Sequence, residues 1–524
     1  MKTIRVLAFC GILLALLAAV ANAAVITAPC GQISGIMADN GANAWLGIPY
    51  AHETSGNYRF RPPQPVADFI GIYNADKYSP ACLQVINPEF KLVDTISENS
   101  LTLNIWSPAT TNSELRIQNS GLAQNLPVCV FIHGGGYTIG SSAQPLYNGA
   151  NLAKNGNIIF VTINYRLGAE GFLYLNEVDE SFAGSGNIGL QDQVAALKWV
   201  QRNIAAFGGD PAQVTIMGES AGAGSVACLM VAPAAKGLFN KAIIESGGFQ
   251  LTKDKSDAAL VTKKFMKYAN CKNIAELQKL SVEQFLTAQA VLMKEYGWLA
   301  NETLFAPVRG DVLIPENPLV SLQNGAARNI SLLVGTNQDE MGLFKRFVPL
   351  KPLMNMTTYR LFVPDDAVTL VGKIDYQVQQ FYQTTYPQLS GIDLLFKAVD
   401  DVFFNVNAYR LADAQSYNGN VYMYRFIWSG EYGAIHGLEL PAVFGNAMPD
   451  AKVYFGNVPL DPLVTKLIQP AWLAFITTGN ASNTPATGLW AQYETIHRPM
   501  LQLSTTAKLR CDIDSAARLF WYNR

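Results

Sequence analysis

The chain is predicted to be an α/β protein with a large, mostly parallel, twisted sheet and helices on both faces. Short apolar runs alternate with amphipathic stretches through its first half, and this order is typical of a parallel sheet buried on both faces. Of its 524 residues, 49% are hydrophobic and 15% are charged, which excludes a long disordered chain. The 40 acidic and 38 basic residues leave a formal net charge of −2, so we expect no nucleic-acid partner.

Residues 1–23 are predicted to be a secretory signal peptide. A basic start precedes the apolar run Val6–Val20, and a small-x-small triplet ends at Ala23. The run is roughly 15 residues long, which is short of the ~20 that a membrane-spanning helix needs. We therefore expect a protein that is secreted, or in the lumen of the secretory pathway, without a membrane anchor. Residues 24–524 form the mature chain.

Secretion would make the Asn-x-Ser/Thr triplets usable for glycosylation, and we expect a glycoprotein. The four acceptor positions are Asn301, Asn329, Asn355 and Asn480.

Six cysteines remain after removal of the signal, and an oxidising compartment permits disulfides between them. They are Cys30, Cys82, Cys129, Cys228, Cys271 and Cys511. Cys129 and Cys228 lie in apolar runs and are predicted to be buried free thiols. No cluster of cysteines and histidines has zinc-like spacing, so we expect no metal site.

The expected elements follow one another without a linker, which predicts a single domain with helical insertions. Helical spacing marks 191–204 and 252–296. The predicted strands are Pro127–Ile132, Ile158–Ile163, Val214–Met217, Ser331–Gly335 and Val421–Ile427.

The most informative motif is Gly-x-Ser-x-Gly, centred on Ser220. It comes directly after a predicted strand and before a small-residue helix. Such a turn lifts the serine hydroxyl above the sheet edge, and glycines at Gly218 and Gly222 keep side chains out of it. This context predicts a nucleophilic serine.

A glycine run, Gly134 to Gly136, follows the strand that ends at Ile132. Consecutive glycines allow backbone N–H groups to converge on the negative oxygen of an acyl-transfer intermediate. We expect the oxyanion hole to consist of the N–H groups of Gly135, Gly136 and Ala221. The preceding His133 is expected to be structural.

These motifs resemble the type-B carboxylesterase/lipase family, which includes the cholinesterases. The resemblance covers nearly the whole mature chain. The matching segments, in the family's order, are Gly47–Ala51, Arg59-Phe60, Glu98–Trp106, Asn164–Gly168, Gly186–Gln193 and Phe207–Pro211. The resemblance implies an α/β-hydrolase fold with helical insertions, and structural ion pairs between Arg59 and Glu98 and between Arg166 and Asp192.

The resemblance also implies a catalytic triad in the chain order serine, acid, histidine. Only His436 and His497 follow Ser220, and His436 lies in a segment similar to the family's histidine loop. The family's acid aligns with Glu340, with Asp339 as the alternative.

Two further carboxylates, Glu219 and Glu439, resemble acids that lie around the triad in this family. For both, plain internal hydrogen bonding is an equally good interpretation.

The chain departs from the family's disulfide pattern. The expected partner of Cys82 is replaced by Ser100, and no cysteine follows Cys271 at the family's spacing. Cys82 and Cys271 are therefore unpaired, or they pair with Cys30 or Cys511.

We expect a serine carboxylic ester hydrolase, of carboxylesterase or lipase type, that acts on a small-molecule or lipid ester and needs no cofactor. The alternative is a catalytically silent adhesion, binding or storage protein of the same family. Acetylcholine is a poor candidate substrate, because the loop from Cys82 to Ser100 lacks the tryptophan that binds quaternary ammonium groups in cholinesterases. Acyl preference and oligomeric state stay open. We expect the pocket walls to come from 252–296 and 349–389.

Overall fold

A computed structural model of the chain describes residues 22–86, 92–109, 125–301, 303–346, 374–447, 456, 459–482, 484–485 and 487–524. Residues 1–21 of the expected signal peptide lie outside this part of the chain, and so do Asn355 and most of 349–389. The first strand begins at Asn22, one residue before the expected cleavage point at Ala23. Cleavage there stays a prediction.

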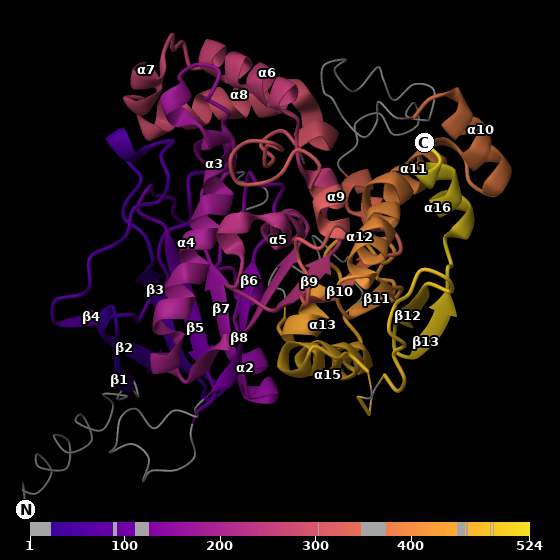
Figure 1. Ribbon diagram of the computed structural model, residues 1–524, viewed down its shortest axis with the longest axis horizontal. Coiled ribbons are helices and arrows are strands. Elements are labelled where there is room, and N and C mark those ends of the chain that lie inside the picture. Colours follow the sequence, from indigo (N-terminus) through magenta and orange to yellow (C-terminus); the bar gives the residue numbers. More distant parts are fainter. Residues whose placement is uncertain are drawn as a thin grey trace, which may run out of the picture.

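Thirteen strands of the described residues form one mixed sheet across the molecule (Figure 1). Its centre is parallel, with the strand order β7-β6-β8-β9-β10-β11-β12, and the flanking pairs are antiparallel except for β4 beside β2. The strands are β1 Asn22–Ala28, β2 Gly31–Met37, β3 Asn43–Pro49, β4 Ile72–Asn74, β5 Thr102–Ser107, β6 Leu126–Ile132, β7 Ile159–Ile163, β8 Gly209–Glu219, β9 Lys241–Glu245, β10 Ser331–Asn337, β11 Val421–Phe426, β12 Pro499–Leu503 and β13 Ala507–Cys511.

Helices cover both faces of the sheet, as predicted. Helices α4, α5 and α12 pack on one face, while α2, α13 and α15 pack on the other. The helices are α2 Ala150–Gly156, α3 Gly168–Phe172, α4 Ile188–Asn203, α5 Ala221–Val231, α6 Lys255–Tyr268, α7 Ile274–Gln278, α8 Val282–Asn301, α9 Pro318–Gln323, α10 Tyr376–Thr385, α11 Gly391–Val399, α12 Val406–Ser416, α13 Leu440–Phe444, α15 Pro462–Thr478 and α16 Ser515–Tyr522. A π-helical turn, η14 Asp400–Asn405, joins α11 to α12.

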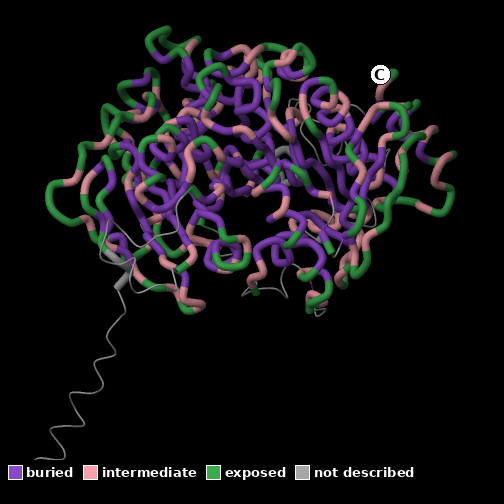
Figure 2. The backbone as a smooth tube through the Cα atoms, turned by 60° about the horizontal axis from the view of Figure 1, so that its bottom comes forward, coloured by how far each residue is buried: buried purple, intermediate pink, exposed green. Residues whose placement is uncertain are grey.

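The central strands bury both of their faces. In β6, Val128 and Val130 enter the core under α4 and α5, whereas Cys129 and Phe131 enter the core under α13 and α15. This alternation follows from the two-residue period of a strand, and it explains why these strands are continuously apolar in sequence. Figure 2 shows the buried backbone filling the interior and the exposed backbone at the rim.

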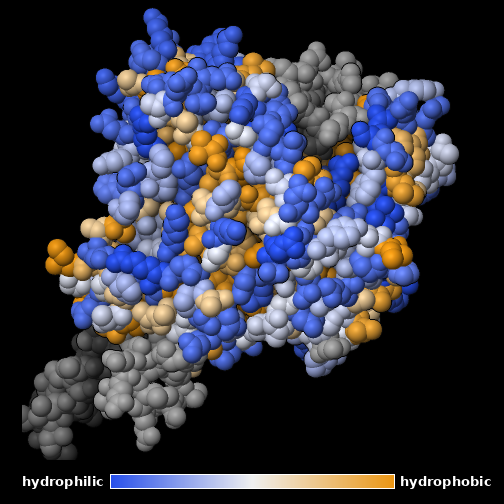
Figure 3. Space-filling model, in the orientation of Figure 1, coloured by the Kyte–Doolittle hydropathy of each residue, from blue (hydrophilic) through white to orange (hydrophobic). Residues whose placement is uncertain are grey.

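The face of the molecule shown in Figure 3 is mainly hydrophilic. On the face shown in Figure 3, apolar residues gather in the middle and hydrophilic residues surround them. Within the described ranges, no helix is both long and apolar enough to cross a membrane.

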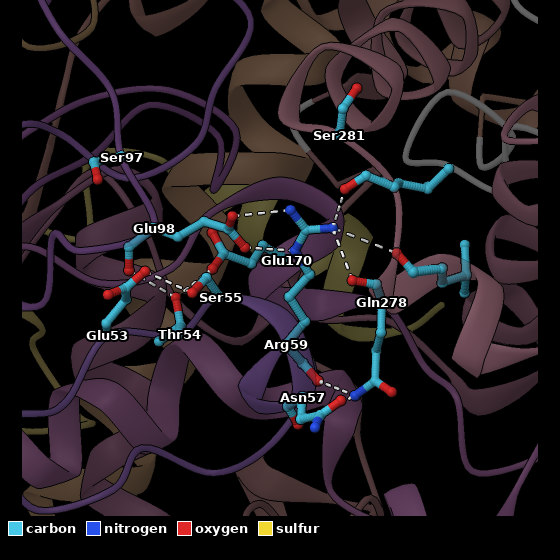
Figure 4. A network of polar contacts seen from close by, with 12 residues as sticks. Glu53, Thr54, Ser55, Asn57, Arg59, Ser97, Glu98, Glu170, Gln278 and Ser281 are labelled. Atoms are coloured by element: carbon cyan, nitrogen blue, oxygen red, sulfur yellow. Dashed lines mark hydrogen bonds and ion pairs between the residues drawn. The ribbon is translucent and has the colours of Figure 1, made fainter.

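Two buried ion pairs tie the loops around the sheet together, as the family resemblance implied. Arg59 pairs with Glu98, with 2.5 Å between Nε and Oε1, and its guanidinium also donates to the carbonyl groups of Gln278 and Leu280 (Figure 4). Arg166 donates twice to the Asp192 carboxylate, at 2.6 and 2.8 Å. Because their partners are fixed and buried, these residues are structural.

The six cysteines that follow the signal are all free thiols. Cys129 and Cys228 are buried, which confirms the sequence prediction. Cys82 forms no new disulfide. Instead, its Sγ accepts a hydrogen bond of 3.0 Å from the Ser100 hydroxyl, so a weak polar contact stands where the family has a covalent bond.

The contact between Ser100 and Cys82 suggests a site for an engineered disulfide. Ser100→Cys is expected to form a disulfide with Cys82 under mild oxidation, because the two side chains already touch. Closing this short loop should stabilise the fold by about 3 kcal/mol. Denaturant unfolding of the same variant with and without reductant measures the gain, and mass spectrometry locates the bond. Equal stability in the two conditions would contradict it.

Candidate active site

Ser220 stands in a strained turn between β8 and α5. Its backbone has φ 57° and ψ −122°, a conformation that residues with a side chain rarely adopt. The close packing of the turn sustains the strain. A Cβ on Gly222 would lie 2.0 Å from the carbonyl oxygen of Ile132, and one on Gly218 would lie 2.4 Å from the carbonyl carbon of Gly222. Only glycine fits at either position, so the structure has the elbow that the sequence predicts.

The glycine run passes directly beside this serine. Strands β6 and β8 are parallel neighbours, and a Cβ on Gly134 would lie 3.1 Å from the Cβ of Ser220. Gly135 and Gly136 both have positive φ, 110° and 57°. Within the described residues, the N–H groups of Gly135 and Gly136 donate to no protein acceptor. Ala221 is the first residue of α5, where helix N–H groups lack partners in their own helix.

His133 has a structural environment. Its ring is buried and stacks on that of Tyr165 with 4.6 Å between the centroids, and its Nδ1 lies 2.9 Å from the carbonyl oxygen of Gly134. Burial lowers the pKa of His133 to about 4, so the ring stays neutral at physiological pH.

The predicted acid and base come together at the ends of adjacent strands. Glu340 follows β10 and His436 follows β11, and Oε2 of the glutamate lies 2.7 Å from Nδ1 of the histidine. The alternative residues have other partners. Asp339 accepts a hydrogen bond of 2.9 Å from the backbone N–H of Ala434, and His497 is 75% exposed beside Glu494.

A second carboxylate faces the other nitrogen of the imidazole. Oε1 of Glu219 lies 3.1 Å from Nε2 of His436. Because Glu219 immediately precedes Ser220, this contact brings Nε2 to the elbow. The histidine therefore lies between two carboxylates.

Asn337 links the acid to the histidine loop, and this role was not predicted from the sequence. Its backbone N–H donates to Oε1 of Glu340 at 2.7 Å. Its side-chain amide donates to the carbonyl oxygen of Ile435 at 2.7 Å and to Oε2 of Glu439 at 2.5 Å. Its position three residues before Glu340 was visible in the sequence, but its partners lie about 100 residues away.

Buried carboxyl groups gather behind the triad residues. Glu439 is fully buried near Glu219 and Glu340, and burial together with these charges raises the pKa of Glu439 to about 8. Burial also raises the pKa of Glu245 well above its usual range, and Trp472 donates a hydrogen bond of 2.7 Å to this residue. At neutral pH these two groups favour the protonated form.

Two aromatic rings cover the imidazole, and neither was singled out from the sequence. The centroid of the Phe404 ring lies 5.2 Å from that of His436, and the centroid of Phe344 lies 5.7 Å away. Apolar cover of this kind limits the access of water to the base.

The comparisons with known proteins agree with this geometry. The model of the Carboxylesterase family matches residues 22–521. The chain belongs to the carboxylesterase family. It is 36% identical to the para-nitrobenzyl esterase of Bacillus subtilis, over 94% of this chain and 97% of that protein. It is 29% identical to the cholinesterase of Mus musculus, over 95% of this chain and 86% of that protein.

Solved structures of carboxylesterases have the same fold. A structure of para-nitrobenzyl esterase superposes with a TM-score of 0.82 at 34% identity, covering 94% of this chain and 98% of that one. The carboxylesterase of Geobacillus stearothermophilus superposes with a TM-score of 0.83 at 32% identity, covering 95% and 99%. The α/β-hydrolase fold is confirmed, and the chain is a serine carboxylic ester hydrolase.

The raised pKa of Glu439 predicts a pH-dependent stability. The folded state binds this proton up to about pH 8, whereas the unfolded state releases it near the ordinary value of 4.5. Stability from this group is therefore complete below about pH 4.5 and is lost as the pH rises towards 8, by at most about 1.4 kcal/mol per pH unit. Glu439→Gln should flatten this slope. Denaturant unfolding of both proteins between pH 5 and 8 measures it, and parallel curves would contradict the prediction.

Proposed function

We propose that the protein hydrolyses carboxylic esters through an acyl-enzyme on Ser220, with His436 as the general base and Glu340 as the acid that orients it. The observation that carries this proposal is the 2.7 Å contact between His436 and the buried Glu340, beside a serine in a strained turn. A serine hydroxyl is a poor nucleophile until a base takes its proton, and the base must be held in the correct tautomer.

The proposed reaction has two halves. Nε2 of His436 takes the proton of Ser220 as its Oγ attacks the ester carbonyl, and the N–H groups of Gly135, Gly136 and Ala221 bind the oxyanion. The imidazolium, stabilised by Glu340, then gives its proton to the leaving alcohol. Water enters, loses a proton to the same nitrogen and releases the acid by attack on the acyl-enzyme.

The substrate class that we propose is a small-molecule or lipid ester of an uncharged alcohol. The loop after Cys82 has no tryptophan for a quaternary ammonium group, which argues against choline esters. Rates over p-nitrophenyl esters of increasing acyl length separate a carboxylesterase, which prefers short chains in solution, from a lipase, which prefers long ones.

Labelling with an organophosphonate probe tests the nucleophile. The folded wild-type protein should be labelled at Ser220, and Ser220→Ala should lose the label and lower kcat about 10³-fold or more. Mass spectrometry of the labelled peptide identifies the residue. Absence of labelling in the folded wild-type protein would instead favour the alternative function, a catalytically silent adhesion or storage protein.

We also propose that the protein is secreted and glycosylated, on the basis of the N-terminal 23 residues and the acceptor triplets. Asn329 and Asn480 are both exposed, as glycosylation requires. Expression of the full chain in a eukaryotic secretory host should give a mature N-terminus at Ala24 and a mass that falls on treatment with a glycosidase. An intact residue 1 in the medium, or no secretion, would contradict this proposal.

A further inference from the structure

One element outside the triad contacts both the acid segment and the histidine. It is the π-helical turn η14, and within the described residues no other helix is of this type. We propose that Asp400, Phe404 and Asn405 of this turn, hereafter the rear support, are positioning residues that fix Glu340 and His436 for catalysis. This inference rests on the proposed function and extends it to residues that do not touch the substrate.

The rear support fixes the segment that follows the acid. Oδ1 of Asp400 accepts a hydrogen bond of 2.7 Å from the backbone N–H of Met341, the residue immediately after Glu340. Asp400 is only 6% exposed, and Met341 is 2% exposed. Removing the acceptor would leave a buried N–H group without a partner, which destabilises the position of this segment.

The rear support also fixes the segment that precedes Glu340. The hydroxyl of Thr336, near the end of β10, donates to Oδ1 of Asn405 at 2.9 Å. The amide of Asn405 in turn donates to Asp401 at 2.9 Å, which sets its orientation. Thr336 precedes Asn337, whose backbone N–H donates to Glu340. The acid is therefore fixed from both sides by side chains of one turn.

The third contact reaches the base. The ring of Phe404 lies against the imidazole of His436, with 5.2 Å between the centroids. The same turn that fixes the acid thus limits the rotation of the histidine.

The π-helical geometry explains how one turn makes all three contacts. In an α-helix, residues five apart lie about 140° apart around the axis, so Asp400 and Asn405 would face different directions. A π-turn has i→i+5 hydrogen bonds, which place such residues on the same side. Phe404, four residues after Asp400, lies on that side in either geometry.

The acid loop and the rear support border one cavity. A cavity of about 620 Å³ is bordered by Asp339, Gly342, Asp400 and Gly433. The hydrogen bond from Met341 to Asp400 fixes the position of the acid segment beside this cavity. A displacement of about 1 Å in a catalytic group can cost about 10²-fold in rate.

The decisive experiment compares kcat and KM of three variants on a p-nitrophenyl ester, each normalised to the folded fraction. Asp400→Ala should lower kcat about 10- to 100-fold with KM within about threefold of wild type. Asp400→Asn retains an Oδ1 acceptor for Met341 and should recover kcat to within about threefold. The matched control is Asp311→Ala, which removes another buried carboxylate that accepts two backbone N–H groups, at 3.0 and 3.1 Å, outside this site.

A lower kcat in Asp400→Ala, with recovery in the asparagine variant and a near-normal kcat in the Asp311→Ala control, supports the proposal. Equal kcat in Asp400→Ala and wild type, or equal losses in Asp400→Ala and Asp311→Ala, would overturn it. If Asp400→Ala does not fold, Thr336→Val serves instead, because it removes only the hydroxyl that donates to Asn405. It should lower kcat about 3- to 10-fold, and an unchanged kcat would overturn the proposal.

Organophosphonate labelling separates this inference from the function on which it rests. If the wild-type protein is labelled at Ser220 and the variants react with the probe at the wild-type rate, only the positioning role of the rear support is refuted. If folded wild type is not labelled, the proposed function fails and the positioning role fails with it.

Discussion

The hydrogen bond between Glu340 and His436 depends on the parallel pairing of β10 and β11, and the rest of the site is arranged around it. The two residues are 96 positions apart in the chain, yet their strands run side by side in register from Leu332 to Asn337. Carboxyl ends of parallel strands meet at one edge of a sheet. The glycine run after β6 and the serine after β8 reach the same edge, so strand pairing alone brings four distant segments together.

That convergence places several carboxyl groups in one buried volume. An isolated charge in such surroundings is unfavourable, and the structure reduces the desolvation penalty of these carboxyl groups in two ways. Glu340 accepts hydrogen bonds from Asn337 and His436. Glu245 and Glu439 have raised pKa values and favour the neutral form. The Glu340 carboxyl group lies 2.7 Å from the imidazole, where it would stabilise the imidazolium of the proposed acyl transfer.

The parts of the site that sequence reasoning predicted are those encoded locally. The elbow at Ser220 is a five-residue pattern, and His436 could be chosen because only four histidines occur and two follow the serine. The strands β6, β7, β8, β10 and β11 were predicted, since continuous apolar runs are typical of buried strands, whereas β9 was not predicted. The fate of Cys82 could not be predicted, because a missing disulfide partner does not say what replaces it.

Ser220 and Glu340 are fixed in position by different forces. This difference explains why the surroundings of the serine can be predicted from the sequence, whereas those of the acid cannot. Ser220 is fixed by steric contact, since Gly218 and Gly222 leave no room for another backbone path, and sterics of this kind require glycine at fixed spacings. Glu340 accepts hydrogen bonds from Asn337 and His436. Its chain neighbours Met341 and Thr336 donate to Asp400 and Asn405, which are 59 and 69 residues away from these donors. Aspartate and asparagine have many structural roles in other settings. The proposed positioning role of Asp400 and Asn405 depends on the direction in which the π-helical turn η14 presents their side chains. Steric repulsion between close backbone segments therefore produces a short sequence motif that can be recognised. Hydrogen bonds between residues far apart in the chain produce no such motif, and they can be identified only from the structure.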